Sequence, residues 1–174
     1  MLKNSFIAIL LATSLHAVPA QAAISSSDRQ ALEGIGCVRV LVEHMDVHAE
    51  RDGFLAATYA SDVELQLRQS GICVLSADEP EPASPAPYLY LRVAMMAQDT
   101  ERRTYAFATA MELFEAMSPQ REPSTVLTAS AWAGRGVIGA VGRGRQDAVR
   151  AQVRAIADQF IQAYMTANRK AVQP

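Results

Sequence analysis

Two long segments of alternating residues constrain the fold of this chain more than any other feature. They cover Tyr88–Ala97 and Thr104–Met117, and the polar stretch Gln98–Arg103 connects them. A period of two is typical of a strand with one buried face. The pair therefore predicts a long antiparallel hairpin. Its buried face would carry Leu89, Leu91, Val93 and Met95 from the first strand and Tyr105, Phe107, Thr109, Met111 and Leu113 from the second.

A βαβ unit is expected ahead of this hairpin. Cys37–Glu43 is β-branched and largely apolar, as a well-covered strand should be. Asp52 is placed to cap a helix, and Gly71 lies where a C-terminal glycine is expected. The short run Ile72–Leu75 supplies a second strand, parallel to the first. The apolar positions of the helix recur every four residues, at Leu55, Tyr59, Val63 and Leu67.

The remaining segments complete a two-layer arrangement. Ser25–Gly34 is expected to be a loose lead-in or one helical turn, and Ser124–Trp132 a fifth strand. Gln146–Asn168 is an amphipathic helix with a stripe from Val149 to Tyr164. The predicted order is β-α-β-β-β-β-α. We expect an α/β (α+β) two-layer sandwich, a mixed sheet of about five strands with two helices on one face.

The first 22 residues have the plan of a secretory signal peptide. Lys3 precedes the ten-residue apolar run Phe6–Leu15, and Ala20-Gln21-Ala22 follows Pro19. A membrane-spanning helix needs roughly 20 apolar residues, so a cleaved leader is favoured over a retained anchor. We expect cleavage after Ala22, a periplasmic or secreted product and no transmembrane span afterwards. Residues 23–174 would form a single domain, with the proline-rich segment 76–87 as an exposed loop.

Composition excludes several classes of protein. Half of the residues are apolar and 20% are charged, which is typical of a globular chain and not of a disordered one. The net charge of −2 argues against a nucleic-acid binder. The charge is uneven, with 8 basic and 16 acidic residues in 23–122 against 7 basic and 2 acidic in 123–174. The two halves are expected to neutralise each other across one fold, although such asymmetry also marks interaction surfaces.

The two cysteines suit an oxidising compartment. Cys37 opens the first strand and Cys73 lies near the start of its parallel neighbour. Alternation directs both side chains away from the face that carries Val38 and Val74. A disulfide is therefore favoured over two buried free thiols. The chain contains no C-x-x-C motif that would make a catalytic dithiol.

The stretch Gly134–Gly139 spells G-x-G-x-x-G, but it does not predict a dinucleotide site. Gly142 and Gly144 interrupt the chain before the last helix, and no strand follows that helix. A glycine-rich hairpin or bulge running out of the fifth strand fits better, and no cofactor is expected. Three arginines, Arg135, Arg143 and Arg145, lie in the longer stretch from Gly134 to Arg145. Arginine guanidinium groups donate paired hydrogen bonds to phosphate or carboxylate, so these residues suit an anionic envelope component as ligand. The alternative interpretation is a basic surface that contacts only solvent.

The histidines support enzymatic chemistry weakly. His44 and His48 are four residues apart among carboxylates, but the segment looks like a polar connection and has no third Cys or His nearby. No metal site is therefore expected. No G-x-S-x-G elbow accompanies them, so no catalytic residues are assigned. A small periplasmic hydrolase or metal-dependent enzyme using His44 or His48 remains the alternative.

Tyr90 and Arg92 lie on the strand face opposite the predicted core, and Tyr105 is also considered for that face. This side of the sheet is the first place to look for a partner protein or a homodimer contact. A purely structural oligomer subunit is a third possibility.

Scattered residues resemble an uncharacterised family of exported bacterial proteins. They are Leu67-Arg68, Gly71-Ile72, Tyr88-Leu89-Tyr90, Trp132 with Gly136, Gly139 and Gly142, and then Phe160, Tyr164 and Ala167-Asn168. The order of elements is also similar to the amino-terminal domain of TolB and to envelope lipoproteins of the curli-secretion type. This resemblance implies a non-catalytic binding or assembly module of the cell envelope. The chain lacks a lipidation cysteine close to the leader, and the family brings no active-site residues.

Overall fold

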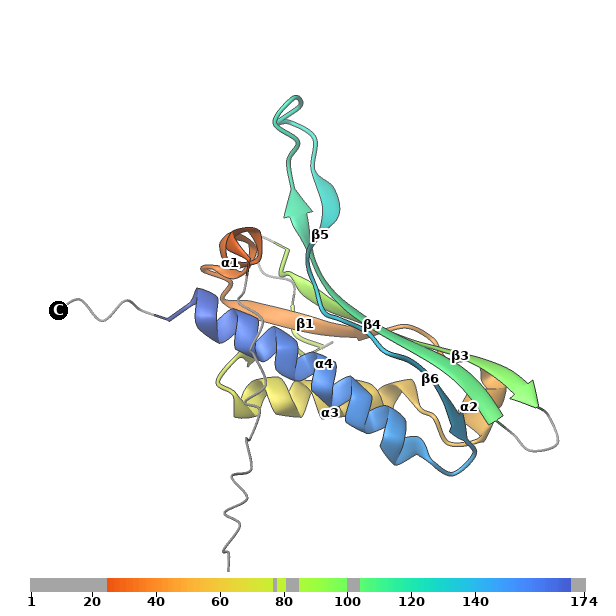
Figure 1. Ribbon diagram of the computed structural model, residues 1–174. Helices are drawn as coiled ribbons and strands as arrows, with labels where there is room; N and C mark the ends of the chain where they lie inside the picture. Colours follow the sequence, from red (N-terminus) through yellow and green to blue (C-terminus); the bar gives the residue numbers. More distant parts are fainter. Residues whose placement is uncertain (1–24, 77, 81–84, 100–103, 170–174) are drawn as a thin grey trace, which may run out of the picture.

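The computed structural model describes residues 25–76, 78–80, 85–99 and 104–169 (Figure 1). Residues 1–22, predicted to be a signal peptide, lie outside this part, as do portions of the proline-rich loop and of the Gln98–Arg103 connection. Among the described residues, no helix combines the length and the apolar character needed to cross a membrane.

A six-stranded mixed sheet forms one layer. Its strands are β1 (Cys37–Val42), β2 (Cys73–Val74), β3 (Tyr88–Asp99), β4 (Thr104–Met117), β5 (Leu127–Ala133) and β6 (Ile138–Gly142). The order across the sheet is β2-β1-β3-β4-β5, and β6 also pairs with β4. β1 is parallel to β2 and β3, whereas β3, β5 and β6 are antiparallel to their neighbour β4. The predicted βαβ unit and the long hairpin are therefore both present.

β5 and β6 lie end to end along the same edge of β4. Glu112–Met117 of β4 pairs with β5, and Thr104–Ala108 pairs with β6. Gly136 lies in the irregular link between them, where a Cβ atom would stand 1.8 Å from the carbonyl oxygen of Thr109. Only glycine allows the link to approach β4 so closely. The glycines that spell G-x-G-x-x-G thus lie in and just after the link between β5 and β6, where the sequence predicts a glycine-rich hairpin or bulge.

The end of the β4–β5 hairpin projects from the body as an arm (Figure 1). β3 accompanies β4 only as far as Phe114, opposite Tyr88, so residues beyond it pair with β5 alone. Val126 and Leu127 are exposed on this arm.

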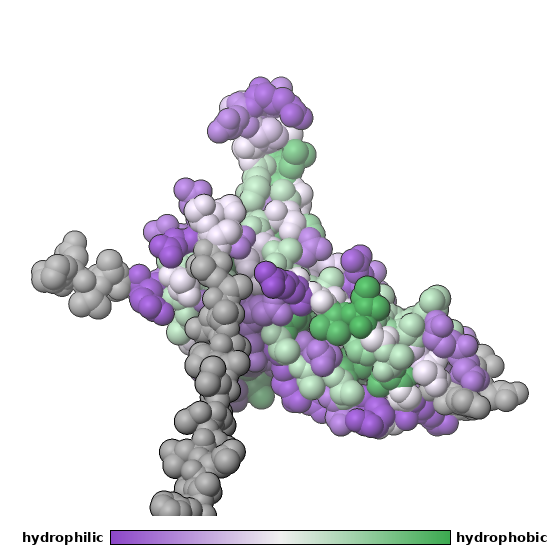
Figure 2. Space-filling model, viewed as in Figure 1, coloured by the Kyte–Doolittle hydropathy of each residue, from purple (hydrophilic) through white to green (hydrophobic). Residues whose placement is uncertain are grey.

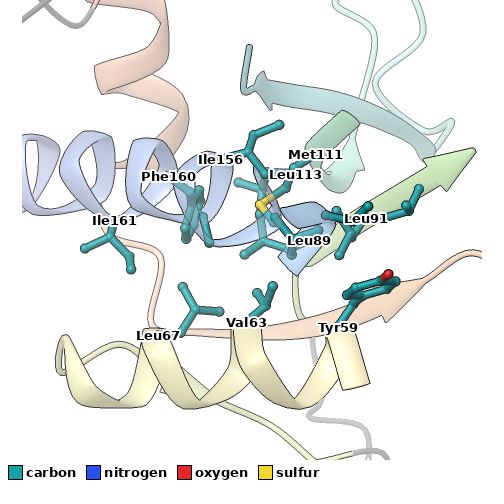
Figure 3. Packing of buried hydrophobic residues seen from close by; sticks show 14 of the residues in the cluster. Tyr59, Val63, Leu67, Leu89, Leu91, Met111, Leu113, Ile156, Phe160 and Ile161 are labelled. Atoms are coloured by element: carbon teal, nitrogen blue, oxygen red, sulfur yellow. The ribbon is translucent and has the colours of Figure 1, made fainter. Parts of the chain in front are cut away.

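Four helices form the second layer: α1 (Ser26–Leu32), α2 (Val47–Arg51), α3 (Ala56–Gln69) and α4 (Gln146–Ala167). α3 and α4 pack beside each other, and α1 packs against α4. Their buried residues meet one face of the sheet in a single core (Figure 3). That core contains Tyr59, Val63 and Leu67 of α3, Ile156, Phe160 and Ile161 of α4, and Leu89, Leu91, Met111 and Leu113 of the sheet. Burial of these side chains supplies most of the stabilisation.

The fold class is confirmed, with differences in detail. The predicted two-layer α/β sandwich with a mixed sheet is present, but the described residues form six strands instead of about five and four helices instead of two. Ser25–Gly34 contains a true helix, because Ser25 accepts a hydrogen bond from the backbone N–H of Asp28. The assignment of Asp52 as the N-terminal cap of α3 was wrong, because Leu55 precedes α3 and no side chain caps that helix. Asp46 caps α2 through the N–H groups of His48 and Ala49, and Asp52 ends that helix.

Candidate functional site

The predicted disulfide is present. Cys37 and Cys73 face each other on β1 and β2 with their Cα atoms 4.5 Å apart, and their sulfurs are bonded. Val38 and Val74, their neighbours, are buried in the core, so both cysteines do lie toward the other face. The bridge ties the two-residue strand β2 to β1, where two residue pairs alone would hold it weakly.

The sheet face opposite the helices carries none of the buried core. We call it the open face, meaning Leu41, Tyr88, Tyr90, Arg92, Ala94, Met96, Ala106, Ala108, Ala110, Glu112, Phe114, Ile138 and Ala140. Exposed apolar side chains are spread across it, at Leu41, Met96 and Ile138. Alanines from β3, β4 and β6 lie side by side between them. An exposed sheet face with apolar side chains of this kind is typical of an interaction site.

One end of the open face holds an aromatic cluster. The ring of Tyr88 stacks on Phe114 at 5.5 Å, and Tyr90 meets Phe114 edge-on at 6.2 Å. The pKa of the Tyr90 hydroxyl is raised, first by desolvation and then by the Glu43 carboxylate beside it. Arg92 is exposed two residues further along the strand, on the same face. Tyr90 and Arg92 therefore lie on the face that the sequence indicated for them.

Tyr105 does not lie on the open face, so that expectation was wrong. Its ring is buried on the core side against Phe54, with ring centroids 5.6 Å apart. Its hydroxyl donates a hydrogen bond of 2.8 Å to the Asp52 carboxylate. The alternation along β4 places Tyr105 with Phe107 and Met111 on the helix side.

The arginines of the glycine-rich stretch do not gather at one point. β6 separates Arg135 from Arg143 and spans about 17 Å at the usual rise per strand residue. Both backbone groups of Arg135 bond to the amide of Gln159 on α4. The Arg143 guanidinium lies 3.3 Å from Asp52, and Arg145 lies 3.7 Å from Asp147. Arg143 and Arg145 keep 53% and 69% of their side chains exposed, so they form the accessible basic pair.

A pocket of about 450 Å³, lined mainly by residues with polar or charged groups, lies where α2, β3, β4 and the loop before α4 meet. Its described lining consists of His48, Arg51, Asp52, Ala97, Asp99, Tyr105 and Arg143. The Asp52 side chain is only 7% exposed and is held by Tyr105 and Arg143. The sequence did not indicate this pocket, because its residues come from four separate segments and share no motif spacing.

The pocket contains one of the two predicted histidines. His48 lines it, whereas His44 is exposed on the connection after β1. The described residues contain no group of three or more His, Cys, Asp or Glu side chains able to hold a metal ion. The described lining offers a histidine, two carboxylates and a tyrosine, but no serine, threonine or cysteine as nucleophile.

A second cavity of about 630 Å³ lies at the base of the arm, between α1, the start of β1 and the residues before β3. Ile35, Leu75 and Pro87 give it an apolar wall, and Glu33 and Glu115 line it too. Burial raises the pKa of the Glu115 carboxyl.

No protein-family model matches the chain, and no curated protein matches it either. Thirteen chains among the solved structures show distant similarity, including the following three. A minor lipoprotein from Acinetobacter baumannii is 7% identical, with a TM-score of 0.36 over 77% of this chain and 93% of that one. A hypothetical protein from Chlamydia trachomatis is 8% identical, with a TM-score of 0.43 over 75% and 98%. The rare lipoprotein B from Shewanella oneidensis is 13% identical, with a TM-score of 0.33 over 75% and 94%.

Proposed function

We propose that this chain is an exported, non-catalytic binding or assembly module of the bacterial cell envelope. The observation that carries the proposal is the open face. All four helices contribute to a core on one side of the sheet, and the other side remains accessible with apolar and aromatic side chains. The leader predicted in residues 1–22 and the disulfide both suit an oxidising compartment outside the cytoplasm.

The occupant we propose for the open face is an envelope protein. Alanines at its centre allow close approach, and the aromatic cluster of Tyr88, Tyr90 and Phe114 supplies the kind of side chains that anchor protein interfaces. Arg92 and Glu112 at adjacent positions would add polar contacts. A homodimer through the same face is the competing occupant.

The experiment places a photo-crosslinking residue at Ala94 on the open face. A matched variant carries it at Leu65, an exposed residue of α3 on the helix side. We expect a specific crosslinked product in intact cells at Ala94 and none at Leu65. Equal products at both positions, or none at Ala94, would contradict the proposal. A product of twice the chain mass would indicate the homodimer instead.

Arg143 and Arg145 support a second ligand class, an anionic envelope component. Both side chains are exposed. In the contacts described, the guanidinium of Arg143 pairs with the Asp52 carboxylate and that of Arg145 with the Asp147 carboxylate. Binding to vesicles that contain anionic lipid should fall in Arg143→Gln/Arg145→Gln and weaken with added salt. Arg68→Gln, on the surface of α3, is the control for a general loss of charge. An equal loss of vesicle binding in Arg68→Gln would contradict the assignment of the anion site to Arg143 and Arg145.

The rival function is a small hydrolase that uses His48. The specific observation in its favour is the pocket that His48 shares with Asp52 and Tyr105. His48→Ala should abolish any hydrolytic activity of the purified protein, and His44→Ala should leave it unchanged. Purified protein with no activity on a broad ester, amide and phosphoester panel favours the binding module.

A further inference from the structure

The outer edge of β6 has unused backbone groups. Val137 bonds to Thr109 of β4, through its carbonyl to the Thr109 N–H and through its N–H to the Thr109 hydroxyl. In an antiparallel ladder, the N–H and C=O groups of one residue both face the partner strand, and those of the next residue both point away from it. Gly139 and Val141 therefore face β4, opposite Phe107 and Tyr105. Ile138, Ala140 and Gly142 direct theirs outward, away from the sheet.

This edge is accessible. Within the described part of the chain, no hydrogen bond satisfies the outward backbone groups of Ile138 or Ala140. The Ile138 side chain is 86% exposed, more than any other large apolar residue described. The space-filling view shows strongly hydrophobic surface where β6 runs beside β4 (Figure 2). Exposed apolar side chains beside unpaired strand groups are a template for another strand.

The edge lacks two of the usual protections against pairing, a charged side chain and a proline within the strand. Natural edge strands are blocked by charges, prolines or inward-pointing lysines. From Leu127 to Gly142 the only charged residue is Arg135, and there is no proline. The backbone of Arg135 is already occupied by the amide of Gln159, which bonds to it as a neighbouring strand would. Pairing is therefore closed at Arg135 and open along β6.

The sequence of β6 is complementary to itself when read in the opposite direction. Centred on Ala140, an antiparallel pairing of Ile-Gly-Ala-Val-Gly with a second copy places Ile138 opposite Gly142, and Gly139 opposite Val141. Each large side chain then lies beside a glycine, and alanine meets alanine on the two-fold axis. The outward-facing residues Ile138, Ala140 and Gly142 become the hydrogen-bonded pairs. The Gly142 carbonyl already accepts a hydrogen bond of 3.2 Å from the Arg145 N–H, so it would bond to Ile138 of the second copy through its other lone pair. No like charges meet across the axis.

We propose that two copies of this chain pair through the outer edge of β6, to form one continuous sheet. A two-fold contact of this kind is self-complementary and closed, which is the usual geometry of homodimers. The axis is perpendicular to the sheet, so the open faces of both copies lie on the same side. The dimer would therefore double the area of the open face without covering it.

The first test measures the molecular mass in solution of residues 23–174, the protein without its predicted leader. Sedimentation equilibrium over a concentration series should show a doubling of mass with rising concentration. A protein that stays monomeric up to its solubility limit overturns the proposal. This result would leave the proposed envelope partner untouched, because that partner binds the open face and not the edge.

The second test locates the contact. Ala140→Cys places two thiols across the axis at about 5.5 Å between Cα atoms, within the range of a disulfide. Mild oxidation should give a covalent dimer of Ala140→Cys. Ala94→Cys, exposed on the open face, is the matched control and should remain mostly uncrosslinked. Crosslinking of Ala94→Cys with none in Ala140→Cys would assign the dimer to the open face and overturn the proposal.

The third test changes the edge without changing the core. Ile138→Lys adds the protection that the edge lacks, and Gly142→Val fills the space reserved for Ile138 of the second copy. A Cβ at Gly142 meets no atom within 4 Å, so the monomer should tolerate the change. Both variants should weaken dimerisation about tenfold or more. Leu65→Lys, the same kind of change on α3, should have no effect, and equal weakening there would count against β6.

Discussion

Gly136 shows how one missing side chain shapes the edge of this sheet. A Cβ there would collide with the Thr109 carbonyl, a backbone atom that cannot rotate away. Gly136→Ala should therefore destabilise the fold by about 1–3 kcal/mol or more, as overpacking does. Chemical denaturation followed by circular dichroism measures this change. Gly36→Ala is the control, because a Cβ at Gly36 meets nothing within 4 Å. Equal loss in both variants would show that the close approach to β4 does not matter.

The ion pair between α3 and α4 makes stability depend on pH. Arg150 donates two hydrogen bonds of 2.7 Å to Asp62, and these bonds hold the pKa of that carboxyl below its usual value. A carboxyl with a lowered folded pKa stabilises the fold fully above its unfolded pKa, near 3.9, and loses this contribution as the pH falls through the folded pKa. The wild type should therefore lose stability below about pH 4.

Thermal unfolding of wild type and Asp62→Asn from neutral to acidic pH tests this dependence. The wild type should melt at the higher temperature near neutrality, and the difference should shrink as the pH falls below the unfolded pKa. Arg150→Gln should flatten the profile in the same way. A difference between wild type and Asp62→Asn that stays constant across the range would contradict the assignment. Tyr59, buried in the same region, has its pKa raised by desolvation to about 12 and stays neutral throughout this range.

At the scale of elements, the disulfide compensates for a very short strand. β2 has two residues, and the bridge closes a segment with a sequence separation of 36. Cys37→Ser/Cys73→Ser should destabilise the protein by about 4 kcal/mol, from the entropy of a loop of this length. Reducing agent should lower the melting temperature of the wild type and leave the double variant unchanged. If reductant has no effect on the wild type, the bridge does not contribute to stability.

Some elements could be predicted from the sequence because their signal is local. β4 was expected at the bounds that the structure shows, since its residues alternate from Thr104 to Leu113 and mostly apolar residues continue to Met117. α4 differs by one residue at its end for the same reason. α2 and β6 were missed because they are five residues long, too short to show a period. Asp52 was assigned to the wrong helix because a capping residue can begin one helix or end another, and only the contacts decide.

The whole molecule depends on one core that lies on one face of the sheet. Phe160 is fully buried there, with its ring 5.2 Å from that of Trp132. Phe160→Ala should cost about 3–5 kcal/mol and alter the Trp132 fluorescence. Phe114→Ala removes the same atoms from the open face, where the ring is half-buried, and should cost clearly less. Equal losses in denaturant midpoints would show that the open face is as well packed as the core.

The sequence by itself determined the class of the fold and which face of each long strand is buried. It also favoured a disulfide between the two cysteines over two free thiols. These features follow from periods and neighbours within a few residues or from one pair of positions. Only the tertiary structure decided that Tyr105 and Asp52 meet, that His48 and Arg143 share a pocket, and that β5 and β6 lie along one edge of β4. Contacts between distant segments depend on how the whole chain packs, and no local pattern in the sequence encodes them.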